Sequence, residues 1–314
     1  MSRPGHLRPG RFFHDERLHF GTRLRVLHLE EMIDLPADAD PASTRRGGAS
    51  IGRSGLIRIL TYNVHRCLGT DRRLSPVRIA DVIAFFEPTI VALQELDVRR
   101  IRTGGIDQAD VIAQRLGMAF HFHPALRVVE ELYGDAILTA LPCKLVRAGP
   151  LPALSTGRRL EPRGAIWASI DVGGTELQVI NTHLGLVARE RVAQVETLLG
   201  PEWLGHPACR EPRILLGDFN AVPRSRAYQR LARRLTDAQR TPGTRRPQAT
   251  FPARLPLLRI DHAFIGDGIE VLDSIVPRTP LTRVASDHLP LVLDLKITAA
   301  SACRSGSVAG PVVR

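Results

Sequence analysis

Between residues 56 and 295, short apolar runs of strand length alternate with stretches of helix length. The expected strands follow one another directly as often as they are separated by a helix, and Gly173-Gly174 marks a hairpin between two of them. Parallel neighbours need a long crossover connection, so hairpin-joined strands argue against a single doubly wound sheet. We therefore expect an α/β fold with two stacked sheets and helices on their outer sides.

Local signals delimit these elements. Ser75 is placed to cap a helix with Pro76 in its first turn, and this helix should run to about Glu87. The run 89–95 is largely apolar, which is typical of a strand covered on both faces. The other expected strands are 56–63, 136–140, 165–172, 177–183, 213–218, 260–265, 270–275 and 289–295, and the other helices are 107–116, 189–199 and 225–235.

The two ends of the chain differ from this central part. Residues 1–55 show no sustained helix or strand periodicity and end in a low-complexity run, so we expect a flexible, Arg-rich leader. Residues 299–314 are rich in Ser, Gly and Ala and are expected to form a disordered tail. The pattern therefore predicts one domain over 56–298.

Composition excludes several classes of protein. A chain of 314 residues that is 44% hydrophobic can build a core, which argues against overall disorder. No stretch approaches 18 uncharged apolar residues, and the first residues lack the apolar run of a secretory signal. The four cysteines are widely spaced without a C-x-x-C pair, so neither a disulfide framework nor a zinc knuckle is indicated. We expect a cytoplasmic protein.

The positive charge is consistent with a phosphate-bearing substrate but does not identify one. The formal net charge is +11, and Lys144 and Lys296 are the only lysines, so arginine supplies nearly all of the positive charge. A basic surface attracts polyanions. An Arg-rich, Lys-poor composition also arises from a GC-rich genome, which is the competing explanation.

Polar side chains interrupt the apolar runs at or beside their ends, where a rigid scaffold presents chemistry. Several carboxylates meeting at strand ends would repel one another unless a positive charge neutralised them. Oxygen ligands suit Mg²⁺ or Mn²⁺ rather than zinc, since no Cys/His pair has zinc spacing. Each position also has a structural explanation, as a turn residue or a helix cap. The polar residues concerned are Asn63, Glu95, His183, Asp218, Asn220, Asp287 and His288.

Taken in order, these positions lie in six motifs that span 57–295. The motifs are T-Y-N-V-H around Asn63, V-A-L-Q-E-L-D around Glu95, V-I-N-T-H-L around His183, L-L-G-D-F-N around Asp218, R-I-D-H around Asp261 and S-D-H-L-P around Asp287. The ordered series resembles the endonuclease/exonuclease/phosphatase superfamily, whose fold is shared by deoxyribonuclease I. That resemblance implies a four-layer α/β/β/α sandwich of two packed mixed sheets flanked by helices.

The resemblance also implies a metal site and a general base. Glu95 would be the main metal-binding carboxylate, with Asn63 and Asp287 contributing directly or through water, and the ion would be Mg²⁺ or Mn²⁺. His288 would take a proton from the attacking water, while Asp261 would orient its ring.

The remaining predicted residues would handle the phosphate group. By the same resemblance, Asp218 and Asn220 would position the nucleophile and a phosphate oxygen, and His183 would contact a non-bridging oxygen or assist the leaving group. Arg163, just before a strand, matches a phosphate-contacting arginine of nuclease members, with a surface ion pair as the alternative. Asp135 could orient His183 or be a turn residue.

Substrate class is less sharply indicated. Motifs typical of inositol polyphosphate phosphatases and of apurinic endonucleases are absent, and aromatic residues make up only 5% of the chain. Our leading hypothesis is a Mg²⁺-dependent phosphodiesterase that acts on nucleic acid as a nuclease. The first alternative is a phosphodiesterase of lipid headgroups, with the Arg-rich leader making peripheral membrane contact. The second is a binding module without catalysis. No obligate protein partner is evident.

Overall fold

The computed structural model describes residues 55–154 and 160–298. The predicted leader and disordered tail lie outside the described residues, apart from Gly55. None of the helices in the described part of the chain combines the length and apolarity that crossing a bilayer requires.

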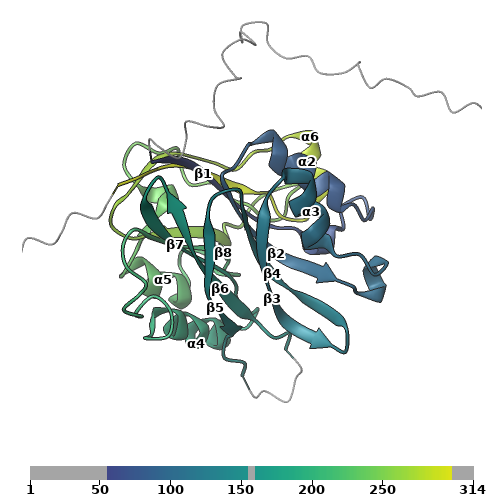
Figure 1. The fold of residues 1–314 in the computed structure, drawn as a ribbon, viewed down its shortest axis with the longest axis horizontal. Helices are drawn as coiled ribbons and strands as arrows, with labels where there is room; N and C mark the ends of the chain where they lie inside the picture. Colours follow the sequence, from purple (N-terminus) through teal and green to yellow (C-terminus); the bar gives the residue numbers. More distant parts are fainter. Residues whose placement is uncertain (1–54, 155–159, 299–314) are drawn as a thin grey trace, which may run out of the picture. The chain divides into compact units, whose positions relative to one another are not determined.

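Two six-stranded sheets form the centre of the structure (Figure 1). The first has the order β11-β12-β1-β2-β4-β3, and β1 and β2 are its parallel pair. The second has the order β5-β6-β7-β8-β10-β9, and β7 and β8 are its parallel pair. All other neighbours in both sheets are antiparallel, so both sheets are mixed, as predicted. The strands are β1 (Leu56–Asn63), β2 (Ile90–Val98), β3 (Ala119–Val128), β4 (Glu131–Thr139), β5 (Cys143–Pro150), β6 (Gly164–Val172), β7 (Thr175–His183), β8 (Arg213–Asp218), β9 (Thr236–Asp237), β10 (Asp261–Ile265), β11 (Ile269–Ile275) and β12 (Leu291–Ile297).

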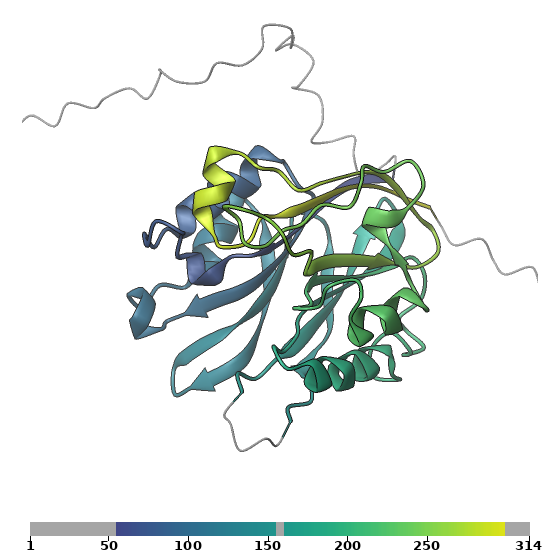
Figure 2. The ribbon, with the colours of Figure 1, turned by 180° about the vertical axis from the view of Figure 1, so that it is seen from behind.

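Helices cover the outer face of each sheet, as both views show (Figure 2). The first sheet carries α2 (Pro76–Phe85), α3 (Gln108–Leu116) and α6 (Pro280–Ala285), and the second carries α4 (Ala188–Leu199) and α5 (Arg226–Ala232). Short 3₁₀ turns occur at His65–Cys67, Ile101–Thr103 and Ala238–Arg240. The predicted cap is present, because the Ser75 side chain accepts a hydrogen bond from the backbone of Arg78. The structure is the predicted four-layer sandwich.

The alternation of side chains along each strand divides the core into layers. In β1, Ile57 and Ile59 lie in the apolar layer between the sheets, whereas Leu60 and Tyr62 lie beneath the helices. Asn63 continues the row of Ile57 and Ile59. The last residue of this strand therefore directs its side chain toward the second sheet.

The sequence prediction misses three strands at the edges of the sheets, namely β3, β5 and the two-residue β9, and shortens others. β3 is largely half-buried and contains Pro124, and β5 is mostly exposed, so neither shows a clear apolar row. The short helix α6 was also not predicted, although Thr279 forms a capping box with Thr282 at its start. The expected helix 225–235 is shorter, since α5 ends at Ala232.

Candidate active site between the sheets

Inward-facing rows of apolar residues end in polar side chains at one edge of the sandwich. In β1, Asn63 ends the inward-facing row. Three strands of the second sheet also carry a polar residue at this edge, in line with their inward-facing apolar residues. These residues are His183 in β7, in line with Val179, Asp218 in β8, in line with Leu216, and Asp261 in β10, in line with Ala263. The parallel pairs and the antiparallel β10 bring these ends together, with Asp261 directly opposite Asp218 and His183 beside it. The register of the second sheet thus brings these three residues together.

A bulge in β2 brings Glu95 into the same cluster. Leu93 pairs with Ala136 and Leu96 with Gly134, so β2 carries one extra residue at this point. Glu95 lies in this bulge and has a left-handed backbone conformation, with φ at 64°. Simple alternation would have directed its side chain away from the second sheet, and the bulge reverses this.

Asn63 connects the carboxylates of the two sheets. Its side-chain nitrogen donates to Glu95 Oε1 at 3.0 Å and to Asp218 Oδ2 at 2.9 Å. Its side-chain oxygen accepts from the backbone N–H of His65 at 3.0 Å, which is consistent with this orientation of the amide. The two carboxylates therefore lie within reach of one common ion.

Asp218 is the most connected carboxylate of the cluster. It is 1% exposed and accepts at Oδ1 from the backbone N–H of Asn220 at 2.8 Å. Its other oxygen lies 3.4 Å from His183 Nε2 and 3.7 Å from His288 Nε2. Burial, together with the nearby charge of Asp261, raises the pKa of Asp218 to about 7, although His288 and the hydrogen bonds oppose this shift.

His288 and Asp261 form a buried dyad. The Nδ1 atom of His288 lies 2.9 Å from Asp261 Oδ2, so the opposite ring nitrogen faces Asp218. Thr250 donates its hydroxyl to the same Asp261 oxygen, and the Phe251 ring packs 4.8 Å from the imidazole. Burial alone would lower the pKa of His288, but the charges of Asp261 and Asp218 outweigh it and raise this pKa to about 10.

His183 is the opposite case. Its Nε2 atom lies 3.1 Å from Asn220 Nδ2, and the same Asn220 nitrogen donates to the backbone oxygen of Leu184. Burial lowers the pKa of His183 well below its ordinary value, and the charges of Arg163 and His288 add to this effect. The two histidines of the cluster are therefore shifted in opposite directions by their surroundings.

Arg163 lies just before β6 and is buried rather than on the surface. Its Nη1 atom donates to Glu161 at 2.9 Å, and its Nε atom has no hydrogen-bond partner among the described residues. Its positive charge contributes to the lowered pKa of His183. Asp135 is also buried and lies against the backbone of Glu95, and burial raises its pKa to about 8.

Asp287 lies at the solvent edge of the site. Its carboxylate is 37% exposed and lies 3.7 Å from His65 Nδ1. Ser286, the preceding residue, donates its hydroxyl to the backbone oxygen of Asn63 at 2.8 Å. Asp287 is thus joined to the cluster through Ser286 and His65.

Some contributors to the site were not predicted from sequence. Beneath Asn63, Gln94 Nε2 donates to Asn181 Oδ1 at 2.7 Å across the gap between the sheets. Asn181 Nδ2 donates to the backbone oxygens of Leu93 and Ala136. Asn181 lies in the V-I-N-T-H-L motif, and this place in the motif could have indicated from sequence that it belongs to the site. Thr250 had no comparable signal, since it lies outside the six motifs.

The chemistry of the cluster suits a hard divalent cation. The polar side chains gathered around Asn63 and Asp218, namely Glu95, His183 and His288, offer oxygen or imidazole nitrogen. Asp218, Asp261 and His288 have potential ligand atoms within 4.8 Å of one another, and Asp261 Oδ1 is buried without a hydrogen-bond partner among the described residues. The carboxylates of Glu95 and Asp218 both accept a hydrogen bond from the side-chain nitrogen of Asn63. Two or more carboxylates held this close gain from a shared cation.

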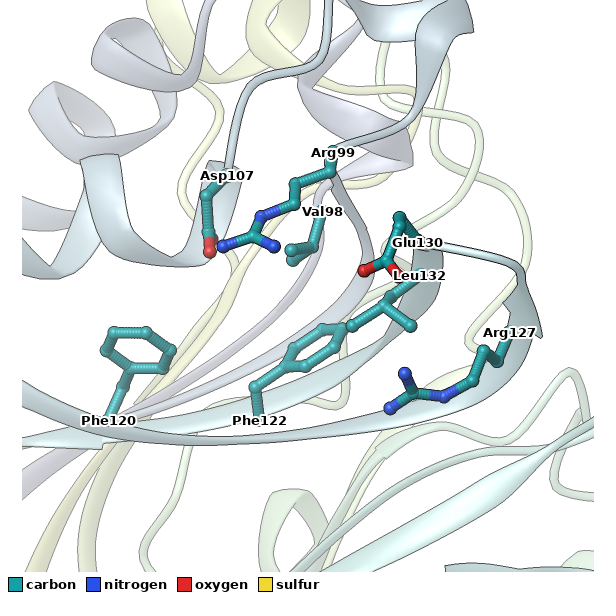
Figure 3. Close-up of a pocket in the computed structure, with 8 residues that line it drawn as sticks. All are labelled: Val98, Arg99, Asp107, Phe120, Phe122, Arg127, Glu130 and Leu132. Carbon is teal, nitrogen blue, oxygen red and sulfur yellow. The ribbon is translucent and has the colours of Figure 1, made fainter.

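A cavity of about 270 Å³ lies apart from this cluster, on the helix-covered side of the first sheet (Figure 3). Its two arginines, Arg99 and Arg127, are matched by the carboxylates of Asp107 and Glu130, and Arg99 extends toward Asp107. None of the predicted site residues lines it. Its balanced charge gives it no preference for an anion.

Comparison with known proteins identifies the family. The sequence profile of the Endonuclease/Exonuclease/phosphatase family matches residues 60–288, and the chain belongs to this family, whose members hydrolyse phosphate esters. Within it, the protein YbhP of Escherichia coli (strain K12) is 25% identical over 251 residues, which cover 76% of this chain and 96% of YbhP.

Two solved structures share the fold. One is an endonuclease/exonuclease/phosphatase from Beutenbergia cavernae DSM 12333, with 22% identity, a TM-score of 0.61 and coverage of 78% of this chain and 72% of that one. The other is a mannosyl-6-phosphatase from Bacteroides thetaiotaomicron VPI-5482, with 20% identity and a TM-score of 0.61. The match covers 76% of this chain and 99% of the mannosyl-6-phosphatase. The sandwich described above is therefore the deoxyribonuclease I-like fold.

Proposed function

We propose that the protein is a divalent-metal-dependent phosphodiesterase that acts on nucleic acid. The observation that supports this most directly is the arrangement around Asp218, where the Asp261–His288 dyad and the Asn63–Glu95 pair meet. The anionic oxygens of a phosphodiester repel an attacking water, so hydrolysis needs a cation to neutralise them and a base to take a proton from the water. The carboxylates can hold such a cation, and the dyad can take the proton.

In this proposal the ion is held by Glu95, with Asn63, Asp218 and Asp287 directly or through water. When bound, it would neutralise the charge of the phosphate oxygens and of the leaving oxygen. The residues named here are those whose oxygens lie nearest the shared Asn63 amide, together with Asp287 at the solvent edge.

The proton moves through His288 in this proposal. A bound cation would lower the raised pKa of His288 and so leave its Nε2 atom free to accept a proton. His288 Nε2 then takes a proton from water as the water oxygen bonds to phosphorus, and the phosphorus–oxygen ester bond breaks. Asp261 keeps the Nδ1 proton in place and stabilises the imidazolium. The released alkoxide then takes up a proton from solvent, and the His288 imidazolium gives its own proton to solvent. His183, neutral because of its lowered pKa, and Asn220 contact a phosphate oxygen, and the Arg163 guanidinium adds positive charge beside it.

The test is a substrate panel with Mg²⁺, Mn²⁺ and EDTA. The panel contains duplex plasmid, a single-stranded oligonucleotide, bis(4-nitrophenyl) phosphate, 4-nitrophenyl phosphate and sphingomyelin vesicles. We expect metal-dependent cleavage of the nucleic acids and a loss of about 100- to 10,000-fold in His288→Ala. The half-buried His121 of β3 provides the matched control, and His121→Ala should retain activity.

Each alternative has its own outcome in the same panel. Intact nucleic acid with turnover of vesicles would replace the nuclease by a lipid phosphodiesterase. Turnover of the monoester alone would make the protein a phosphatase. No turnover of any substrate, together with no binding of a divalent ion by calorimetry, would leave a binding module.

A further inference from the structure

A second cavity, of about 440 Å³, lies on the rim of the second sheet and is lined by four arginines. They are Arg240, Arg245, Arg246 and Arg259, and Gln239 lines the cavity with them. None of the lining residues is acidic. This composition differs from that of the cavity in Figure 3, where two carboxylates match two arginines.

Two of the lining side chains carry buried donors without a partner. Arg259 is 7% exposed, and its Nη2 atom donates to Asp237 at 2.6 Å and to the Tyr228 hydroxyl at 3.1 Å. Its Nη1 atom has no hydrogen-bond partner among the described residues. Gln239 is 2% exposed, and its oxygen accepts from the backbone of Gln248 at 2.8 Å, while its Nε2 atom is likewise unpaired in the described part of the chain.

A buried donor that finds no acceptor is unfavourable, and such groups are rare in native structures. In both side chains, the atom that forms hydrogen bonds fixes the position of the atom that forms none. Asp237 and Tyr228 hold the Arg259 guanidinium, and the Gln248 backbone holds the Gln239 amide. Arg259 and Gln239 therefore each bring one fixed, unsatisfied donor to the lining of the cavity.

The exposed arginines supply the charge. Arg245 pairs with Asp273 at 3.1 Å, whereas Arg240 and Arg246 form no ion pair within the described residues. Two uncompensated guanidinium groups over two buried donors favour an anion with several acceptor oxygens. Arginine forks match phosphate oxygens in this way.

Two lining residues are close in the chain to residues of the candidate active site. Arg259 precedes the dyad residue Asp261 by two residues, and Pro223 follows Asn220 by three. The Arg259 guanidinium itself extends to Asp237, which pairs with Phe264 of β10. Successive phosphates along one strand of duplex DNA advance by about 3.4 Å along its axis. A strand of several nucleotides is therefore long enough to span the separation between the site and the cavity.

We propose that this arginine-lined cavity is a phosphate subsite that binds a backbone phosphate of the nucleic acid flanking the bond to be cleaved. The assignment of the phosphate to nucleic acid rests on the proposed function. The subsite itself rests on the unpaired donors and on the four arginines.

The test compares three proteins. Arg240→Ala/Arg246→Ala removes two positive charges from the cavity. Arg233→Ala/Arg234→Ala removes two exposed charges that do not line the cavity, and is the matched control. A third variant, Gln239→Glu, keeps the acceptor for the Gln248 backbone but replaces the unpaired donor with a negatively charged oxygen. Thermal unfolding of each variant shows that it folds.

Two measurements are made on each protein. Calorimetric titration of inorganic phosphate into EDTA-treated protein reports on the subsite without turnover. Steady-state kinetics then compare kcat/KM for an oligonucleotide with kcat/KM for bis(4-nitrophenyl) phosphate, which is too small to bridge both places. We expect the cavity variants to weaken phosphate binding about tenfold or more and to lower oligonucleotide kcat/KM by a similar factor. The small diester and the control variant should be unaffected.

The salt dependence adds a readout that a structural defect would not produce. Loss of one or two phosphate contacts should flatten the slope of log(kcat/KM) against log[salt] for the oligonucleotide by about 1–2. Unchanged phosphate binding in both cavity variants would overturn the subsite. Weaker phosphate binding with unchanged oligonucleotide kinetics would show an anion site that is not used by this substrate and would overturn the assignment to nucleic acid. If the wild type does not cleave oligonucleotides, the proposed function fails, and the phosphate titration still decides whether the subsite exists.

Discussion

Asn63 of the first sheet donates a 2.9 Å hydrogen bond to Asp218 of the second sheet, and the same nitrogen atom donates to Glu95. This one amide holds two acidic groups close together without an opposing positive charge of its own. The arrangement explains why the candidate site suits a cation and how residues from both sheets contribute to it. It also shows which substitutions test the assignment.

Replacing the shared amide by a carboxylate should make the fold depend on metal. Asn63→Asp removes the donor and places a third negative charge beside Glu95 and Asp218. We expect the free energy of unfolding in EDTA to fall by about 1–3 kcal/mol. Saturating Mg²⁺ or Mn²⁺ should restore most of this loss, because an ion that binds the folded state stabilises it. Thermal unfolding with and without the ion is the measurement.

The control for this added negative charge is Gln229→Glu, which adds the same charge on the exposed surface of α5. It should change stability by less than about 0.5 kcal/mol in either condition. Equal losses in Asn63→Asp with and without the ion would argue against a cation at the Asn63 amide.

The role of Asp261 separates catalysis from ion binding. Asp261→Asn keeps the shape of the dyad but places an amide opposite His288 Nδ1, which favours the wrong tautomer. We expect kcat to fall by about 10³- to 10⁴-fold. The affinity for the divalent ion, measured by calorimetry, should change by no more than about threefold, since Glu95 and Asp218 remain. Comparable losses in turnover and ion affinity would instead make Asp261 a metal ligand.

Binding of the ion should release protons in a pH-dependent manner. Asp218 has a pKa raised to about 7 and His288 a pKa raised to about 10, so the metal-free cluster still holds protons at pH 8. A cation beside the carboxylates favours their charged form and lowers both pKa values. We expect release of about 0.5–1 proton per ion at pH 8. Release should fall to about half near pH 10, the pKa of His288, and approach zero about one to two pH units higher, where both groups have already lost their protons.

Calorimetry in two buffers of different ionisation enthalpy measures this release. His288→Ala should reduce it at pH 8, and His121→Ala should leave it unchanged. Release that stays constant from pH 7 to 10.5 would show that neither Asp218 nor His288 is coupled to the ion.

The bridge between the sheets should contribute strongly to stability. Asn181→Leu removes the partner of Gln94 and leaves the Leu93 and Ala136 carbonyl groups buried without donors. We expect a loss of about 2–4 kcal/mol, as for a disrupted buried polar network. Gln114→Leu, at an exposed amide on α3, should cost less than about 0.5 kcal/mol in the same denaturant titration. A loss in Asn181→Leu as small as that of the control would contradict the bridge.

Much of this molecule could be predicted from local patterns. The apolar rows, the Ser75 cap and the Gly173-Gly174 hairpin delimit most of the elements, because strand period and cap chemistry act over a few residues. The positions of Asp218 and His183 at strand ends were likewise readable. Edge strands such as β3 were missed because half-buried residues leave no clear apolar period.

The order of residues along the chain determined which side chains end the strands, and therefore which groups were available for chemistry. Tertiary structure decided how those groups were used. The β2 bulge turned Glu95 toward Asn63, Thr250 came to hold Asp261 from outside the motifs, and Arg259 and Gln239 converged on one cavity. These relationships join residues far apart in the chain, and their geometry depends on register and packing between sheets, which no local pattern specifies.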